Sequence, residues 1–142
     1  MLTEGNKRRI SDHLGLALGL FVSVQFSPTS TEYDVRNGFS RLYYAFFHAS
    51  LAFLLSQGED IDVFRWHHGD LHTAVGKLMG KYLGKFFRDL YKTRQQADYE
   101  PSFFSRSFGG NLDKARAEAQ NLLRRANKNF YWIYHESRKA LE

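Results

Sequence analysis

The segment SRLYYAFFHASLAFLL, Ser40–Leu55, decides the fold. Fourteen of its sixteen residues are apolar, aromatic or small, and the two exceptions are Arg41 and His48. Along this segment and just before it, apolar residues recur at steps of three and four, which is typical of one face of an α-helix. These residues are Val35, Phe39, Leu42, Phe46, Ala49 and Phe53. We therefore predict a helix that is buried along this face.

Three other segments show the same helical spacing. It predicts helices over about residues 10–24, 71–99 and 112–133, and glycines within the middle one predict close packing or a bend. Those glycines are Gly76, Gly80 and Gly84. Thr29 and Glu32 have the spacing of a capping box and predict the start of the buried helix, which we expect to end near Gly58. No segment alternates in the manner of a strand. The sequence therefore predicts an all-α fold, an antiparallel up-down four-helix bundle in which residues 1–142 form one domain.

Composition narrows the classes of function. The chain has 142 residues and no cysteine, which excludes disulfides, cysteine zinc fingers and thiol nucleophiles and favours a reducing, cytoplasmic setting. The apolar runs 14–26 and 42–55 are shorter than the roughly 18–20 residues that cross a bilayer, so we expect no membrane partner. A formal net charge of +5 suits an anionic partner such as RNA or a nucleotide, although ordinary solubility also explains it.

The polar residues of the buried helix raise the question of function. Arg41, Tyr44 and His48 stand at i, i+3 and i+7, so they share one face of the helix. In one interpretation, Arg41 pairs with an acid of a neighbouring helix and His48 is a satisfied core histidine. In the other, both face a polar groove, where a histidine can act as a general base beside a cation.

Three motifs, in order, carry a resemblance to a known family. VRNGFSRLYYAFFHASLAFLL resembles the signature helix of HEPN domains, in the branch that reads Ser-Arg-x-Tyr-Tyr-Ala-x-x-His. HHGDL, His67–Leu71, resembles the family's His-x-Gly entry into the third helix, and RQQADY, Arg94–Tyr99, resembles its Arg-x-x-Ala-Asp-Tyr ending. Together the motifs and the helices between them cover about two thirds of the chain.

The resemblance implies a helical bundle, commonly a homodimer, that binds RNA or a nucleotide without a cofactor. Many HEPN proteins are metal-independent endoribonucleases of toxin–antitoxin or defence systems, and others are partners of small nucleotidyltransferases. Catalytic members have an Arg-x4-6-His motif, whereas here Arg94 is followed by Tyr99 in the place of the histidine. Because tyrosine, with a pKa near 10, is a poor base at neutral pH, this departure favours an inactive or atypical member. Cleavage of RNA stays open.

We expect one polar groove to carry the site. In it Arg41 and Arg94 hold phosphate, Asp98 orients an arginine, and Tyr44, His48, His67 and Tyr99 line the walls. If the chain cleaves RNA, the catalytic residues are Arg41, His48 and Arg94; Arg94 also fits a purely structural cation. The alternative is a non-catalytic interaction protein, partnering a nucleotidyltransferase, whose polar stripe only fixes the packing of the helices.

Two other groups of residues allow competing interpretations. His67, His68 and His72 suggest a metal site, but a polar helix entry explains them without one, and we expect no bound metal. In the connection EPSFFSRSFGG, Phe103, Phe104 and Phe108 suit either stacking on bases or a plug at the end of the bundle, and we favour the plug. Near the C-terminus, an excess of aromatic residues predicts a subunit interface: Tyr131, Trp132 and Tyr134.

Overall fold

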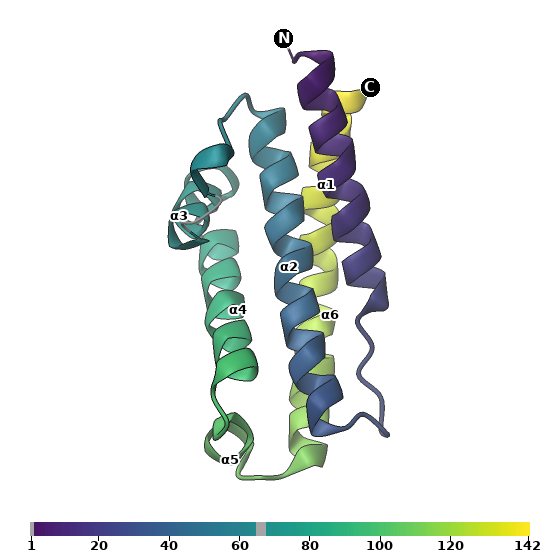
Figure 1. The fold of residues 1–142 in the computed structure, drawn as a ribbon, viewed down its shortest axis with the longest axis vertical. Coiled ribbons are helices and arrows are strands. Elements are labelled where there is room, and N and C mark those ends of the chain that lie inside the picture. The colour runs from purple at the N-terminus through teal and green to yellow at the C-terminus, as the bar shows by residue number, and fades with distance from the viewer. Residues whose placement is uncertain (1, 65–67) are drawn as a thin grey trace.

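The computed structural model describes residues 2–64 and 68–142, and these residues form helices connected by short turns (Figure 1). No strand occurs among them. The helices are α1 (Glu4–Ser23), α2 (Glu32–Ser56), α3 (His68–Met79), α4 (Lys81–Tyr99), α5 (Phe103–Phe108) and α6 (Leu112–Arg138), with single 3-10 turns at Asp62–Phe64 and Lys139–Leu141. The predicted all-α fold is confirmed. In the part of the chain that the structure describes, no helix has an apolar stretch long enough to cross a membrane.

Helix α2 is the centre of the molecule. It packs against α1, α4 and α6, and α6 also contacts α1 (Figure 1). Helices α3 and α4 follow one another along the side of α2 that lies away from α1. This position of α2 explains why its sequence is so apolar, because three neighbours cover it. Its buried side chains meet those of α4 and α6 in the core, which includes Tyr43, Phe46, Phe87 and Phe130.

The start of α2 differs from the predicted position. The capping box is formed by Thr31 and Asp34: the Thr31 side chain accepts from Asp34 N, and Asp34 Oδ2 accepts from Thr31 N at 2.9 Å. The prediction of a capping box at Thr29 and Glu32 is therefore wrong, because the actual box lies two residues further along the chain. The reason is local: the Thr29 side chain and backbone N–H both hydrogen-bond to Ser27 Oγ in the preceding turn, so Thr29 is not free to cap the helix.

The glycines between α3 and α4 mark a break with close packing. Gly80 has φ +105°, a value that L-residues rarely adopt, and it ends the regular helix between Met79 and Lys81. A Cβ atom on Gly84 would lie 2.7 Å from Gly76 Cα, so the two helix backbones nearly touch. The predicted bend with close packing is confirmed.

The connection after α4 folds into the core. Phe103, Phe104 and Phe108 are buried on the short helix α5, as the plug interpretation predicted. Arg36 of α2 fixes this end of the molecule, because its Nη1 donates to the carbonyl oxygen atoms of Ala97 at 2.8 Å and Glu100 at 3.0 Å. These carbonyls lie at the C-terminal end of α4, where a cation is favourable.

Candidate functional site

Arg94 is enclosed between α2 and α4 by aromatic rings. Its Cζ atom lies 5.0 Å from the ring centre of Tyr43, 5.4 Å from that of Tyr44 and 5.2 Å from that of Tyr91. The residue is only 6% exposed, and its Nε atom has no hydrogen-bond partner among residues 2–64 and 68–142. The electron-rich faces of the rings attract the guanidinium in place of water. The arginine therefore holds α4 against α2.

Asp98 and Tyr99 lie at the outer edge of this cluster. Asp98 Oδ2 is 3.6 Å from Arg94 Nη1 and accepts a hydrogen bond of 3.3 Å from Ser40 Oγ. Tyr99 is 71% exposed, and its ring centre is 6.0 Å from Arg94 Cζ. The sequence left two roles open for Arg94, a phosphate ligand or a structural cation. Its enclosure favours the structural role.

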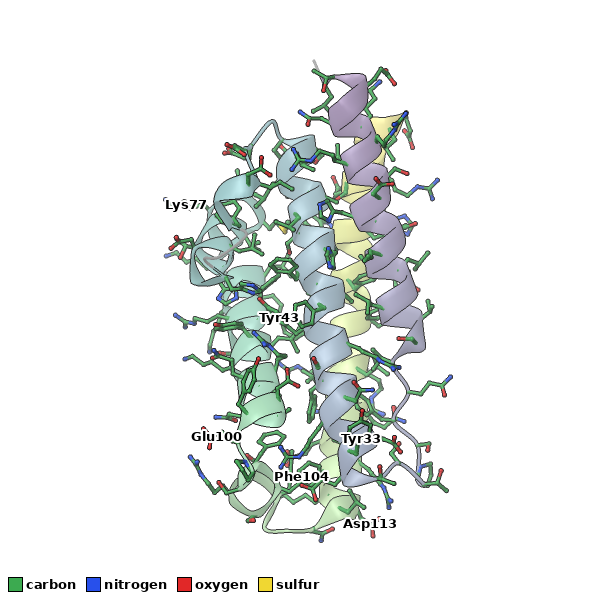
Figure 2. All side chains as sticks on the ribbon, in the orientation of Figure 1. Tyr33, Tyr43, Lys77, Glu100, Phe104 and Asp113 are labelled. Carbon is green, nitrogen blue, oxygen red and sulfur yellow. The ribbon has the colours of Figure 1, made fainter. Side chains whose placement is uncertain are left out.

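Tyr43 connects the arginine cluster to His68. Tyr43 is fully buried between α2 and α4 (Figure 2). Its hydroxyl oxygen lies 2.7 Å from His68 Nδ1. Burial raises the pKa of Tyr43 far above its usual range, so the hydroxyl keeps its proton. Burial, with the nearby charge of Arg94, lowers the pKa of His68 and favours its neutral form. The hydrogen bond engages Nδ1 of His68 and leaves its Nε2 atom for another partner.

A second pair of imidazoles joins α1 to α2. His13 Nδ1 and His48 Nδ1 are 3.0 Å apart, and the rings stack with centres 5.3 Å apart. Burial lowers the pKa of His48 to about 4, and proximity to His13 adds to this effect. Burial and the charge of Arg9 lower the pKa of His13 as well. At neutral pH both rings are uncharged, and one donates its Nδ1 proton to the other.

These imidazoles line one hollow of about 370 Å³, which we call the histidine pocket. The ring of His68 stacks on that of Phe47, with centres 4.7 Å apart. Arg9 and Asp62 form an ion pair in its wall, with Arg9 Nη2 2.8 Å from Asp62 Oδ1. The lining residues are Arg9, His13, Tyr44, Phe47, His48, Leu51, Ile61, Asp62 and His68.

The histidine pocket offers a specific set of interactions. Because the Nδ1 atoms of all three imidazoles are already paired, each ring has only its Nε2 atom left for a ligand; Arg9, paired with Asp62, supplies a cation, and Phe47 and Tyr44 supply ring faces. Hollows of this size, largely apolar with a few polar groups, are typical sites for small molecules or for one unit of a polymer. The arrangement therefore suits a planar ring with polar edges that carries an anionic group.

Arg41 does not share a hollow with Arg94. Arg41 is exposed and lines a separate polar hollow of about 280 Å³ with Ser27, Ser30 and Asn37, at the connection between α1 and α2. Arg94 lies on the other flank of α2, against α4. The expectation of one groove containing both guanidiniums is thus corrected. Residue 41 is turned toward α1, because on the helix it lies about 100° from Ser40 and about 160° from Tyr43, and these two residues face α4. Tyr44 lies between the two flanks, since it contacts Arg94 and also lines the histidine pocket.

Of the remaining predicted residues, His48 lies in the histidine pocket and His67 lies outside the described residues. The sequence interpretation missed Arg9, His13 and Phe47. His13 did carry a signal, since it stands between Ile10 and Leu14, at the border of the apolar face. When two neighbouring helices each carry a histidine at the border of the apolar face, the pattern indicates that the two histidines contact each other. Phe47 carried none, because an aromatic residue in this segment looks like any other core residue.

Comparisons of the chain with protein-family models, with curated proteins and with solved structures give no match.

Proposed function

We propose that the chain is a HEPN-type domain that binds RNA, and that the histidine pocket receives one nucleotide of the strand. The observation that carries this proposal is the lining of the pocket: three uncharged imidazoles, two aromatic rings and the ion pair of Arg9 with Asp62 surround a hollow of about 370 Å³. The resemblance of three sequence motifs to HEPN domains adds to it. The basic character of the chain, with a formal net charge of +5, is in keeping with an anionic ligand.

Each part of a nucleotide has a partner in the pocket. The base stacks on the ring of Phe47 or Tyr44, as unpaired bases do in proteins that bind single strands. The imidazoles of His13 and His48 supply donors and acceptors for the base edges or the ribose hydroxyl groups. His68 presents its Nε2 atom, because Tyr43 occupies its Nδ1, and Arg9 attracts the phosphate.

The site suits binding better than cleavage. A general base for attack by a ribose 2′-hydroxyl works best with a pKa near the working pH, whereas His48 has a pKa of about 4. Tyr99, in the place of the family's catalytic histidine, is exposed beside an enclosed arginine. The pairing of Arg41 with His48 as a nuclease centre loses support, because Arg41 lines a different hollow.

The finer features of fold and setting belong to this proposal. If α3 and α4 are counted as one broken helix, the four helices of the proposed up-down bundle are α1, α2, α3–α4 and α6. We further propose a homodimer in the cytoplasm, within a toxin–antitoxin or defence system. Trp132, which is 44% exposed near the end of α6, marks a surface suited to the second subunit.

A second candidate function is that of an interaction protein that partners a small nucleotidyltransferase. Large exposed apolar side chains on α1 favour it: Leu16 is 47% and Val22 59% exposed. Such residues suit a protein interface more than an RNA-binding surface. In that case the histidine pocket only ties α1 to α2.

Binding of a labelled 20-nucleotide single-stranded RNA, followed by fluorescence anisotropy in EDTA, separates the two functions. We expect salt-sensitive binding that weakens at least tenfold in His48→Ala and in His68→Ala. His135→Ala is the matched control, because His135 is exposed on α6 away from the pocket, and it should bind like the wild type. The RNA should stay intact in this assay.

Two results count against RNA binding at the pocket. One is a wild-type protein that does not bind RNA but forms a complex with a nucleotidyltransferase, which favours the interaction protein. The other is a folded His48→Ala variant that binds RNA as tightly as the wild type. RNA cleavage in EDTA that is lost in His48→Ala would instead make the pocket a nuclease centre.

A further inference from the structure

A second hollow, distinct from the histidine pocket, lies where α3 crosses α4. It has a volume of about 340 Å³, and we call it the basic hollow. Gly76 and Gly84 contribute only backbone to it, so no side chain fills the space beside the crossing. Its walls carry the side chains of Thr73, Lys81, Lys85 and Arg88.

The charges around the basic hollow have one sign. Lys81, Lys85 and Arg88 stand at i, i+4 and i+7 on α4, so their side chains share one face of that helix. No carboxylate lines the hollow among the described residues. The nearest acid along the helix, Asp89, does not line the hollow and makes no ion pair within 4.0 Å with any described cation. Cations gathered without a partner repel one another, and an anion between them relieves that repulsion.

His72 adds an unsatisfied polar group at the same place. It lines the basic hollow, is only 6% exposed and packs against the rings of Phe87 and Tyr91. Its Nε2 atom has no hydrogen-bond partner in the described part of the chain. Burial lowers the pKa of His72 to about 4, so at neutral pH the ring is uncharged and does not add to the charge of the three cations.

We propose that the basic hollow binds backbone phosphates of the same RNA strand whose nucleotide enters the histidine pocket; this rests on the proposed function. The cations from Lys81 to Arg88 extend over about 10 Å of α4 at 1.5 Å per residue, which exceeds the size of one phosphate group. A strand with consecutive phosphates satisfies them all, whereas an isolated phosphate does not. His68 of the histidine pocket and His72 of the basic hollow are one turn apart on α3, and the proposal requires a strand that extends from one site to the other.

The salt dependence of RNA binding tests this proposal. A cation that contacts the phosphate backbone of a single strand contributes about 0.7 to the slope of log K against log salt concentration. The variant Lys85→Gln/Arg88→Gln should therefore lower the slope by about 1.4 and weaken binding about tenfold at low salt. Lys114→Gln/Lys128→Gln, which removes the same charge from exposed positions of α6, is the matched control and should leave the slope within about 0.5 of the wild type.

The outcomes separate this proposal from the proposed function. Equal slopes for the two double variants overturn the basic hollow, even if His48→Ala weakens binding and the histidine pocket stands. If the salt slope falls in Lys85→Gln/Arg88→Gln but His48→Ala binds RNA normally, RNA does not bind at the histidine pocket and the basic hollow is the site of RNA contact. In calorimetry, inorganic pyrophosphate should bind the wild type more weakly than the RNA does, and equal affinities would make the hollow a site for small anions.

Discussion

Replacing Arg94 by alanine should lower the free energy of unfolding by about 3–5 kcal/mol. The change empties space between the rings of Tyr43, Tyr44 and Tyr91, and large-to-small changes in a core cost about 2–5 kcal/mol. The lost attraction between cation and rings contributes about 2 kcal/mol when it is desolvated, as here. The ion pair with Asp98 adds little, because the side chain of that acid is 27% exposed. These contributions overlap, so their sum is an upper bound.

Urea unfolding followed by circular dichroism measures the effect. Arg94→Met keeps most of the apolar stem and should recover about half of the loss, because it removes the charge but leaves no large cavity. Arg124→Ala on α6 is the control; Arg124 is exposed, and its loss should change stability by less than about 0.5 kcal/mol.

One result would refute this reasoning about Arg94. If Arg94→Ala unfolds within about 0.5 kcal/mol of the wild type, the side chain is not enclosed as described. If Arg94→Met is folded but no longer binds RNA, the arginine contacts the ligand, as the family motif implies, and the structural role is wrong.

Two further predictions concern the glycine crossing and acid stability. Gly84→Ala should destabilise the protein by about 1–2 kcal/mol in urea unfolding, because the added Cβ would meet only backbone atoms, which cannot move aside. Gly76→Ala, whose Cβ has an ordinary 3.7 Å contact, should be neutral or stabilising by up to about 1 kcal/mol. A change of the same sign in both variants would contradict the close crossing of α3 and α4. Thermal stability should fall as the pH drops from 7 to 5, because the unfolded chain protonates His48 near pH 6.5 and the folded chain only near pH 4. His48→Gln should flatten that dependence, and an unchanged profile in this variant would contradict it.

Most of the fold could be predicted from the sequence because each long helix shows a helical spacing of its apolar residues. The apolar residues that marked residues 10–24 and 112–133 became the buried faces of α1 and α6, as did those of α2. Errors arose where the signal was local. Thr29 and Thr31 both stand three residues before an acid, so both fit a capping box. Only Thr31 caps the helix, because Thr29 is hydrogen-bonded in the preceding turn.

The site was harder to predict because it depends on the directions of side chains across helices. Residues 41 and 94 both carry a guanidinium, yet α2 lies between them, and only the packed structure shows which flank each one takes. His13 contacts His48 across 35 residues of sequence. Such a pair becomes visible only when the packing of α1 on α2 is known, although each histidine lies at the border of an apolar face.

Histidine resonances in an NMR titration with a dinucleotide such as ApU test the central claim most directly. The imidazole signals of His13, His48 and His68 should shift together and saturate at one dissociation constant, because all three line one pocket. His135, exposed on α6, should not move. Shifts confined to His135, or no saturable shift of the three pocket histidines, would contradict the account.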